Sequence, residues 1–323
     1  MGRKVDFCGT CPRFFILSGY LFSEKTFKQT VRSGFCNLLL PYFATVVILL
    51  GVTRLYPLFP KLISEVKRHD LLIGAVYGSG TTIPFFLNNS FTISAIGAIW
   101  FLLAMFWGNL LFTAILKYSK KKLYVCTISA SLVATLGFYL SHRGIYLPWS
   151  LNVALVSQVF YLGGYMIRKF ELLQKNAGLW CGLGVILWGL STQSGFFYLN
   201  VAQADAPFLA VLGGIGGSFV LMFLADKLTS KDWELKYLNY YGQMSLIVLC
   251  IHLLDLNGLN VAPKVLELRL KFTQNTALAV GIEILYRLMV TVIGIIVLPK
   301  LPYLRSFYLN RKYPFGWEKS KAH

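Results

Sequence analysis

A histidine and an aspartate lie three residues apart in one strongly apolar segment, where His252 precedes Asp255. Residues three apart share one face of a helix, so the carboxylate can orient the imidazole and stabilise its charged form. Ionisable groups within an apolar span are expensive to bury, and this pair is therefore a candidate for proton transfer in catalysis. The structural alternative is a histidine that bonds to a neighbouring helix and holds a bundle together.

A second ionisable pair, Glu283 and Arg287, lies four residues apart in the last apolar segment. This spacing lets the two charges satisfy each other on one helix, which favours a structural ion pair, with substrate binding as the alternative. Counted inward from the same predicted membrane face, Asp255 and Arg287 lie at similar depths, about 16 Å at the 1.5 Å rise of a helix. We therefore expect the two pairs to cluster if their helices are neighbours.

Other cationic and aromatic side chains suggest how a substrate is held. Arg32 and the cluster Lys120–Lys122 would meet the phosphates of a cytoplasmic ligand, although positive charge beside apolar segments also anchors membrane proteins. Trp100 and Tyr42, with Tyr20, would form an aromatic wall against a sugar. The alternative for these three residues is an aromatic belt at the membrane interface.

The composition indicates that the elements positioning these residues lie in a bilayer. Of the 323 residues 56% are hydrophobic and 14% are charged, and the mean hydropathy is +0.61, which excludes an ordinary soluble enzyme. The net charge of +18 comes from clusters between apolar runs, so it indicates membrane orientation and no nucleic-acid partner. Cys8 and Cys11 form C-x-x-C without a second pair or a nearby histidine, and no metal site is predicted.

Apolar runs long enough to cross about 30 Å of hydrocarbon predict an all-α, polytopic transmembrane helix bundle of about nine spans, in a single domain covering residues 1–323. The predicted spans are 5–22, 35–52, 96–116, 123–141, 150–167, 179–199, 207–225, 244–260 and 277–298. The segment 53–95 is predicted as an external loop, in which the apolar, Gly-rich stretch 71–87 is a candidate re-entrant segment.

Lys and Arg residues divide unequally between alternate connectors. One set of connectors, together with the C-terminal tail, holds 19 of them, and the other set holds 10. Because positively charged loops stay in the cytoplasm, we expect an integral membrane protein of the bacterial inner (plasma) membrane with a cytoplasmic C-terminus.

Five short motifs in a fixed order resemble landmarks of the membrane acyltransferase 3 family, most closely its fucose 4-O-acetylase-like branch. The motifs are FFILSGYLF at 14–22, LLLPY at 38–42, IWFL at 99–102, YLGGY at 161–165 and YGQMSL at 241–246 leading to His252. Each motif is weak alone, but their order makes the resemblance specific, and it extends from about Phe14 to Leu298.

The resemblance implies a membrane O-acyltransferase that moves an acetyl group from acetyl-CoA to a sugar hydroxyl of a surface or lipid-linked glycan. Its partners would be acyl-CoA, the glycan or lipid-linked sugar, and membrane lipid. Two alternatives stay open: a transporter or flippase for a glycan intermediate, and a truncated, non-catalytic membrane partner. A transporter would be expected to show internal repeats, and none is visible in the sequence.

The sequence departs from this family at its beginning. The family carries a further first helix with a histidine taken as the catalytic base, and often a second histidine just before the proline of the next helix. Here Pro12 takes the proline position, and Thr10 stands where the second histidine would be. We expect a truncated chain, a loss of catalysis, or a base supplied from elsewhere, for which His252 is the local candidate.

Overall fold

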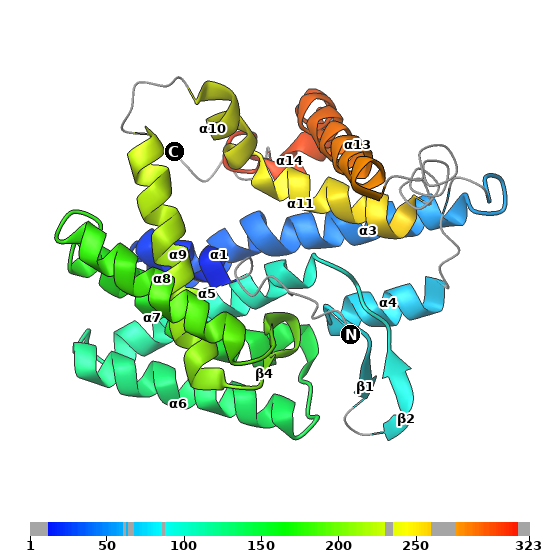
Figure 1. The fold of residues 1–323 in the computed structure, drawn as a ribbon. Helices are drawn as coiled ribbons and strands as arrows, with labels where there is room; N and C mark the ends of the chain where they lie inside the picture. The colour runs from blue at the N-terminus through cyan, green and yellow to red at the C-terminus, as the bar shows by residue number, and fades with distance from the viewer. Residues whose placement is uncertain are drawn as a thin grey trace.

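The computed structural model describes residues 12–60, 63, 68–85, 88–229, 235–259 and 276–315. Helices make up nearly all of its regular structure (Figure 1). In chain order they are α1 (Pro12–Tyr20), α2 (Phe27–Gly34), the π-helix η1 (Phe35–Leu39), α3 (Leu40–Arg54), α4 (Arg68–Tyr77), α5 (Trp100–Tyr118), α6 (Leu123–His142), η2 (Pro148–Ser150), α7 (Leu151–Lys169), α8 (Ala177–Gln193), η3 (Leu199–Val201), α9 (Pro207–Thr229), α10 (Lys236–Gln243), α11 (Ser245–Leu253), the π-helix η4 (Leu254–Gly258), α13 (Thr276–Val297), η5 (Leu298–Lys300) and α14 (Leu304–Tyr308).

Six helical stretches in the described part of the chain are long and apolar enough to cross a membrane. They are Phe27–Arg54, Trp100–Tyr118, Leu123–His142, Pro148–Lys169, Pro207–Thr229 and Val280–Lys300. Each overlaps one of the nine predicted spans, because a long uninterrupted apolar run in lipid must satisfy its backbone hydrogen bonds as a helix. The all-α polytopic bundle is therefore confirmed, whereas the count of nine spans is not.

The three remaining predicted spans fall on shorter helices. Span 179–199 corresponds to α8, which has 17 residues, and span 244–260 corresponds to the stretch Ser245–Gly258 of α11 and η4. Helix α8 ends before Gly195, whose φ of +123° is accessible mainly to glycine, and the chain then forms the strand pair β3 (Phe197–Tyr198) and β4 (Gln203–Ala204). Span 5–22 is described only from Pro12, as α1.

The predicted external loop 53–95 contains regular structure. Helix α4 is followed by the antiparallel pair β1 (Ile83–Phe85) and β2 (Asn88–Ile93), so the re-entrant candidate 71–87 divides between a helix and a strand. Hydrogen bonds hold this region against η2: the Ser150 hydroxyl donates to the Gly78 carbonyl at 2.5 Å, and the Tyr77 hydroxyl donates to the Tyr146 carbonyl.

Glycines let the helices of the bundle approach closely. Gly19 of α1 lies against the Tyr161 carbonyl of α7, and Gly164 of α7 lies against the Ile16 carbonyl of α1, so a Cβ atom at either glycine would collide with backbone. Gly184 of α8 meets the backbone of α9 in the same way. Small residues are the usual basis of tight helix packing in membranes, where the hydrophobic effect does not drive helices together.

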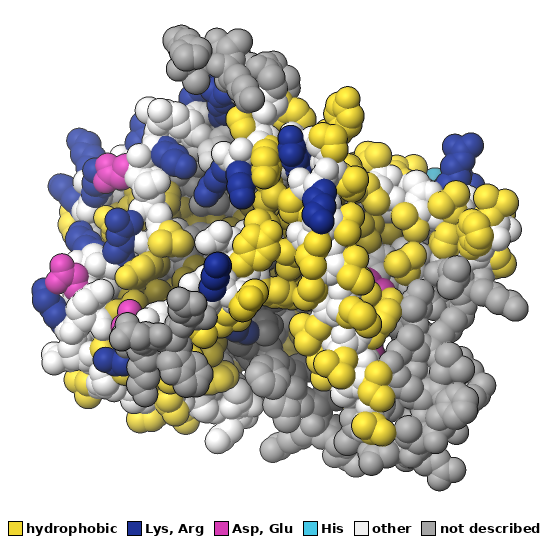
Figure 2. Space-filling view, turned by 90° about the horizontal axis from the view of Figure 1, so that it is seen from above, with side chains coloured by type: hydrophobic (Ala, Val, Ile, Leu, Met, Phe, Trp, Pro, Cys, Tyr) yellow, Lys and Arg dark blue, Asp and Glu magenta, His cyan; other side chains and the backbone are white. Residues whose placement is uncertain are grey.

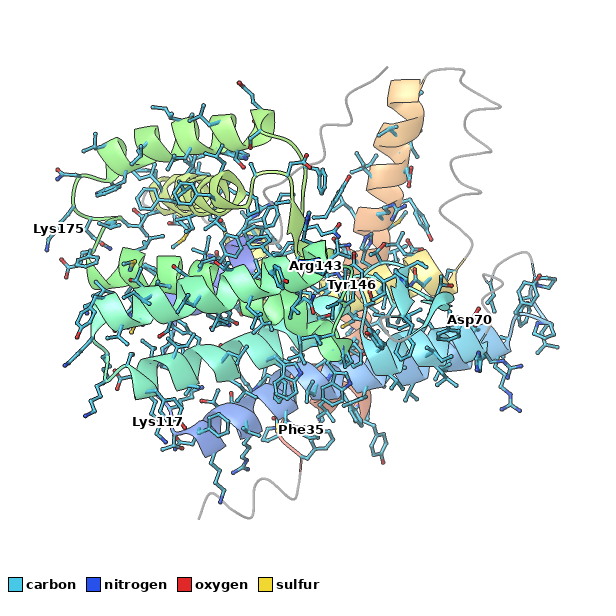
Figure 3. The ribbon with its side chains drawn as sticks, turned by 90° about the horizontal axis from the view of Figure 1, so that it is seen from below. Phe35, Asp70, Lys117, Arg143, Tyr146 and Lys175 are labelled. Atoms are coloured by element: carbon cyan, nitrogen blue, oxygen red, sulfur yellow. The ribbon has the colours of Figure 1, made fainter. Side chains whose placement is uncertain are left out.

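Connectors rich in Lys and Arg gather at one end of the bundle, where blue side chains concentrate in Figure 2. Lys121, between α5 and α6, forms a 2.7 Å ion pair with Glu24, between α1 and α2. Figure 3 places Lys117 and Lys175 at this end and Asp70 at the other. We call it the basic end. The structure thus brings together connectors that the alternation of spans assigns to one membrane side.

Candidate functional site

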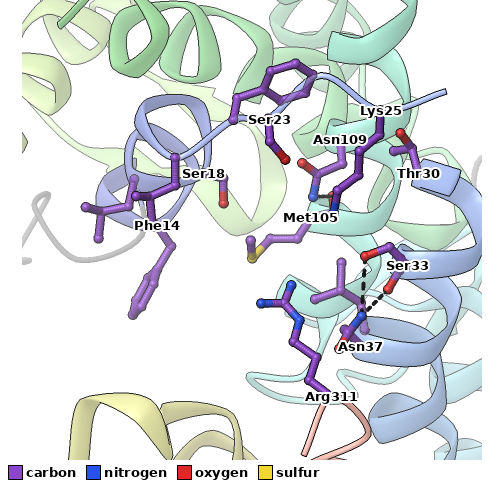
Figure 4. Close-up of a pocket in the computed structure, with 15 residues that line it drawn as sticks. Phe14, Ser18, Ser23, Lys25, Thr30, Ser33, Asn37, Met105, Asn109 and Arg311 are labelled. Carbon is purple, nitrogen blue, oxygen red and sulfur yellow. Dashed lines mark hydrogen bonds between the residues drawn. The ribbon is translucent and has the colours of Figure 1, made fainter. Parts of the chain in front are cut away.

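Two overlapping cavities open among α1, α2, η1, α5 and the C-terminal segment. They have volumes of about 480 Å³ and about 410 Å³ and share Lys25, Ser33 and Asn37. We call them together the basic cleft, because their walls include Lys25, Arg32 and Arg311. Figure 4 shows the larger cavity with polar side chains from each of these elements directed toward it.

A third cavity, of about 540 Å³, continues from the basic cleft. It shares Phe14, Leu38 and Met105 with the cleft, and most of its other wall is apolar. Leu246 and Leu249 of α11 form part of that wall. We call this cavity the apolar chamber. A ligand that spans both cavities would have an anionic or polar part in the cleft and an apolar part in the chamber.

The local sequence explains the polar wall of the cleft. Thr26 and Gln29 form a capping box that starts α2: the Thr26 N–H donates to the Gln29 side chain at 3.0 Å, and the Gln29 N–H donates to the Thr26 hydroxyl at 3.3 Å. The helix then widens into the π-helix η1, a distortion found frequently at functional sites, and Asn37 lies within it. The Asn37 amide donates to the Ser33 carbonyl at 2.6 Å, as the dashed lines of Figure 4 show.

The cleft is electrostatically positive. Within the described residues no Asp or Glu side chain lines any of the three cavities. The nearest carboxylate in sequence, Glu24, is paired with Lys121 on the neighbouring connector at 2.7 Å. The described ion pairs include none with Lys25, Arg32 or Arg311, so these cations remain available to an anionic ligand.

The structure separates two of the aromatic candidates, Trp100 and Tyr42. Trp100, 5% exposed, lines the apolar chamber at the start of α5, with its indole ring held against Gly80. Tyr42 lies outside the lining of all three cavities, and its buried hydroxyl donates to the Ala75 carbonyl of α4 at 2.5 Å. Tyr42 therefore contributes to packing between α3 and α4.

The ionisable residues of the last two predicted spans meet where α11, which continues into η4, packs against α13. Asp255 is 2% exposed, and its Oδ1 accepts a 2.7 Å hydrogen bond from the Tyr286 hydroxyl. Its Oδ2 is buried and has no hydrogen-bond partner among the residues that the structure describes. Glu283 and Arg287 form the expected pair on α13, with Nη2 to Oε1 at 2.7 Å. We call these four residues and His252 the charge cluster.

His252, a member of the charge cluster, lies next to the apolar chamber on α11 but does not line it. It follows Leu249 by three residues on α11, and Ser245, Leu249 and His252 share one helical face, so the imidazole lies about 4.5 Å along the helix beyond the last chamber residue. It is half-buried, and the charges of Asp255 and Arg287 both act on it. The described hydrogen bond of Asp255 goes to Tyr286 and not to His252.

Several residues of these sites were not predicted, among them Tyr286, Asn37 and Arg311. Tyr286 follows Glu283 by three positions and so lies on the same helical face, a spacing from which it could have been predicted. Asn37 is a lone amide in an apolar run, and a polar residue in such a run could also have been predicted as a site residue. Arg311 stands in a polar tail with no motif around it, and only the fold brings it to the cleft. Among the described residues no three His, Cys, Asp or Glu side chains come together as a metal site requires.

The family of the chain follows from a comparison with family models. The model of an acyltransferase domain, that of the acyltransferase 3 family, matches residues 10–298. Comparisons with curated proteins and with solved structures gave no match. The match covers most of the chain, including every helix from α1 to α13. With apolar helices able to span a membrane, the chain belongs to the acyltransferase 3 family and is a membrane acyltransferase.

Proposed function

We propose that this single membrane domain moves an acetyl group from acetyl-CoA to a sugar hydroxyl of a surface or lipid-linked glycan, as a member of the fucose 4-O-acetylase-like branch. The family match supports acyl transfer over glycan transport. The basic end would face the cytoplasm of a bacterial inner membrane, because cationic connectors stay on that side and acetyl-CoA is a cytoplasmic donor.

The basic cleft carries this proposal. CoA is a polyanion joined to a less polar thioester arm, and the cleft offers the cations Lys25 and Arg32 together with the apolar side chains of Phe14 and Met105. Charge-assisted hydrogen bonds from Arg and Lys are the strong contacts that proteins make with phosphates. The thioester arm would then point toward the apolar chamber, next to Trp100.

The charge cluster would accept the proton that the sugar hydroxyl loses. A sugar hydroxyl attacks the thioester carbonyl only as its proton leaves, and His252, three residues beyond Leu249 of the chamber wall, would accept that proton. The tetrahedral intermediate then collapses, the carbon–sulfur bond breaks, and the CoA thiolate takes up a proton as it leaves. The charge of the Asp255 carboxylate would offset part of the cost of a positive imidazole, against burial and the charge of Arg287, and Tyr286 would hold that carboxylate in place.

The test is acetyl transfer in membranes from cells that express the full chain. With radiolabelled acetyl-CoA, label should appear in glycans, and excess unlabelled CoA should suppress it. The double variant Lys25→Gln/Arg32→Gln should raise the KM for acetyl-CoA at least tenfold, because hydrogen bonds to charged groups contribute about 1.5–3 kcal/mol each. The control Lys175→Gln removes a cation of the same end that lies outside the three cavities and should leave KM unchanged.

Two results would contradict the proposal. Glycan movement across the membrane without label transfer would identify a transporter. An equal KM for acetyl-CoA in the double variant and in Lys175→Gln would place the donor outside the basic cleft.

A further inference from the structure

The C-terminal segment Tyr308–Lys312 contributes to every cavity of the site, although the family match ends at residue 298. Arg311 lines both the larger cavity of the basic cleft and the apolar chamber, and Asn310 lines the smaller cavity. Part of the wall of the site therefore comes from outside the matched acyltransferase domain.

This segment is fixed in place by buried contacts. Tyr308 is 4% exposed, and its hydroxyl lies 3.0 Å from the hydroxyl of Thr45 on α3, which itself donates to the Pro41 carbonyl at 2.8 Å. Helix α14 also packs against α3. The residues immediately before Arg311 are thus anchored in the core of the bundle, which limits where its side chain can go.

The Arg311 side chain enters the cleft at a position where it can receive an anion. Figure 4 shows its guanidinium reaching into the larger cavity from the C-terminal segment, opposite Ser18 and below Lys25. The residue is exposed to the cleft, and no described ion pair involves it. A guanidinium presents a planar fork of donors that matches two oxygens of one phosphate. Arg311 lies between the cleft and the chamber. A ligand with its anionic part in the cleft and its apolar part in the chamber would therefore have its last phosphate near this guanidinium.

We propose that Arg311 is a phosphate-binding residue, supplied to the site by a segment outside the matched domain, and that it positions a phosphate-bearing ligand between the basic cleft and the apolar chamber. The identification of that ligand as the acyl donor rests on the proposed function. A phosphate-linked lipid acceptor presents the same chemistry, and the choice of probes separates the two sources.

The experiment measures equilibrium binding to the full chain in lipid nanodiscs. The probes are CoA, geranyl diphosphate as a phosphate-bearing isoprenoid, and pantetheine, which keeps the thiol arm of CoA without phosphate. The variants are Arg311→Gln and Arg311→Lys, with Lys117→Gln as the control, since Lys117 is an exposed cation of the same end that lines none of the three cavities. Each variant is folded if its elution volume and its unfolding temperature equal those of the unmodified chain.

Arg311→Gln should weaken binding of CoA at least tenfold, a loss expected for charge-assisted hydrogen bonds, and should leave binding of pantetheine unchanged. Arg311→Lys should lose less, because it keeps the charge without the fork, and Lys117→Gln should bind CoA as the unmodified chain does. A tenfold loss confined to geranyl diphosphate would also support the phosphate site and assign it to the acceptor.

Two outcomes overturn the inference. One is equal affinity of Arg311→Gln and the unmodified chain for both phosphate-bearing probes, and the other is binding of neither probe by the unmodified chain. If Arg311→Gln binds CoA as tightly as the unmodified chain does, acyl-CoA can still be the donor, but Arg311 does not contact it. Binding of geranyl diphosphate without any binding of CoA would instead count against the proposed donor.

Discussion

The basic cleft and the charge cluster hold their charges in opposite ways. In the cleft, exposed cations such as Arg32 and Arg311 have no carboxylate in the described wall. In the cluster, Glu283 is bonded to Arg287 and Asp255 is bonded to Tyr286. The cations of the cleft are therefore open to an anionic ligand, whereas the charges of the cluster have partners within the protein, as ionisable groups in apolar helices of a membrane protein require.

One atom breaks this rule within the cluster. The Oδ2 of Asp255, in a residue that is 2% exposed, is buried without a hydrogen-bond partner among the described residues. A buried oxygen without a partner is costly, and a change to positive charge nearby would stabilise it. His252, three residues earlier, is the group whose protonation would make that change.

The largest effect should come from removing the proposed base. We expect His252→Ala to lower the rate of acetyl transfer by about 10²- to 10⁴-fold, the usual contribution of a positioned general base. The matched control is His69→Ala, because His69 is an exposed histidine of α4, beside Asp70 at the end of the bundle opposite the basic end. Transfer is measured with radiolabelled acetyl-CoA in membranes. Equal rates in the two variants would remove His252 from catalysis.

A smaller effect should appear when the partner of the buried aspartate is removed. Tyr286→Phe leaves both oxygens of Asp255 without a described hydrogen bond, and we expect a loss of about 1–3 kcal/mol in stability. The double variant Tyr286→Phe/Asp255→Leu should recover most of that loss, since replacing both partners removes the unsatisfied group. Thermal unfolding in detergent measures both. A double variant that is less stable than Tyr286→Phe would show that the carboxylate has other partners.

The smallest effect should come from the exposed ion pair of the basic end. Bonding to Glu24 raises the pKa of Lys121 above its ordinary value of 10.5, so any stability from the pair is present below that range and is lost as the pH rises through the raised pKa. Both side chains are more than half exposed, and such pairs contribute little. Glu24→Gln should therefore leave the unfolding temperature unchanged at pH 7. A clear decrease at pH 7, absent at pH 11, would mean that this end is held together by charge.

The sequence predicts the parts of this fold that depend on local signals. Long apolar runs located the six spanning helices, and the spacing of Glu283 and Arg287 predicted their ion pair, because both signals are read within one helix. The shortening of α8 and the π-helix η4 depend on backbone geometry that periodicity does not encode. The position of Arg311 at the cleft depends on a tertiary contact between the C-terminal segment and α3, and no local sequence pattern predicts such a contact.

The most direct test of the account is a structure of the chain in a lipid nanodisc with a nonhydrolysable analogue of acetyl-CoA. We expect phosphate density against Lys25, Arg32 and Arg311 in the basic cleft, with the acyl end of the analogue in the apolar chamber on the side of His252. Analogue bound at the opposite end of the bundle, near Asp70, or a basic cleft occupied by lipid while the analogue lies elsewhere, would contradict it.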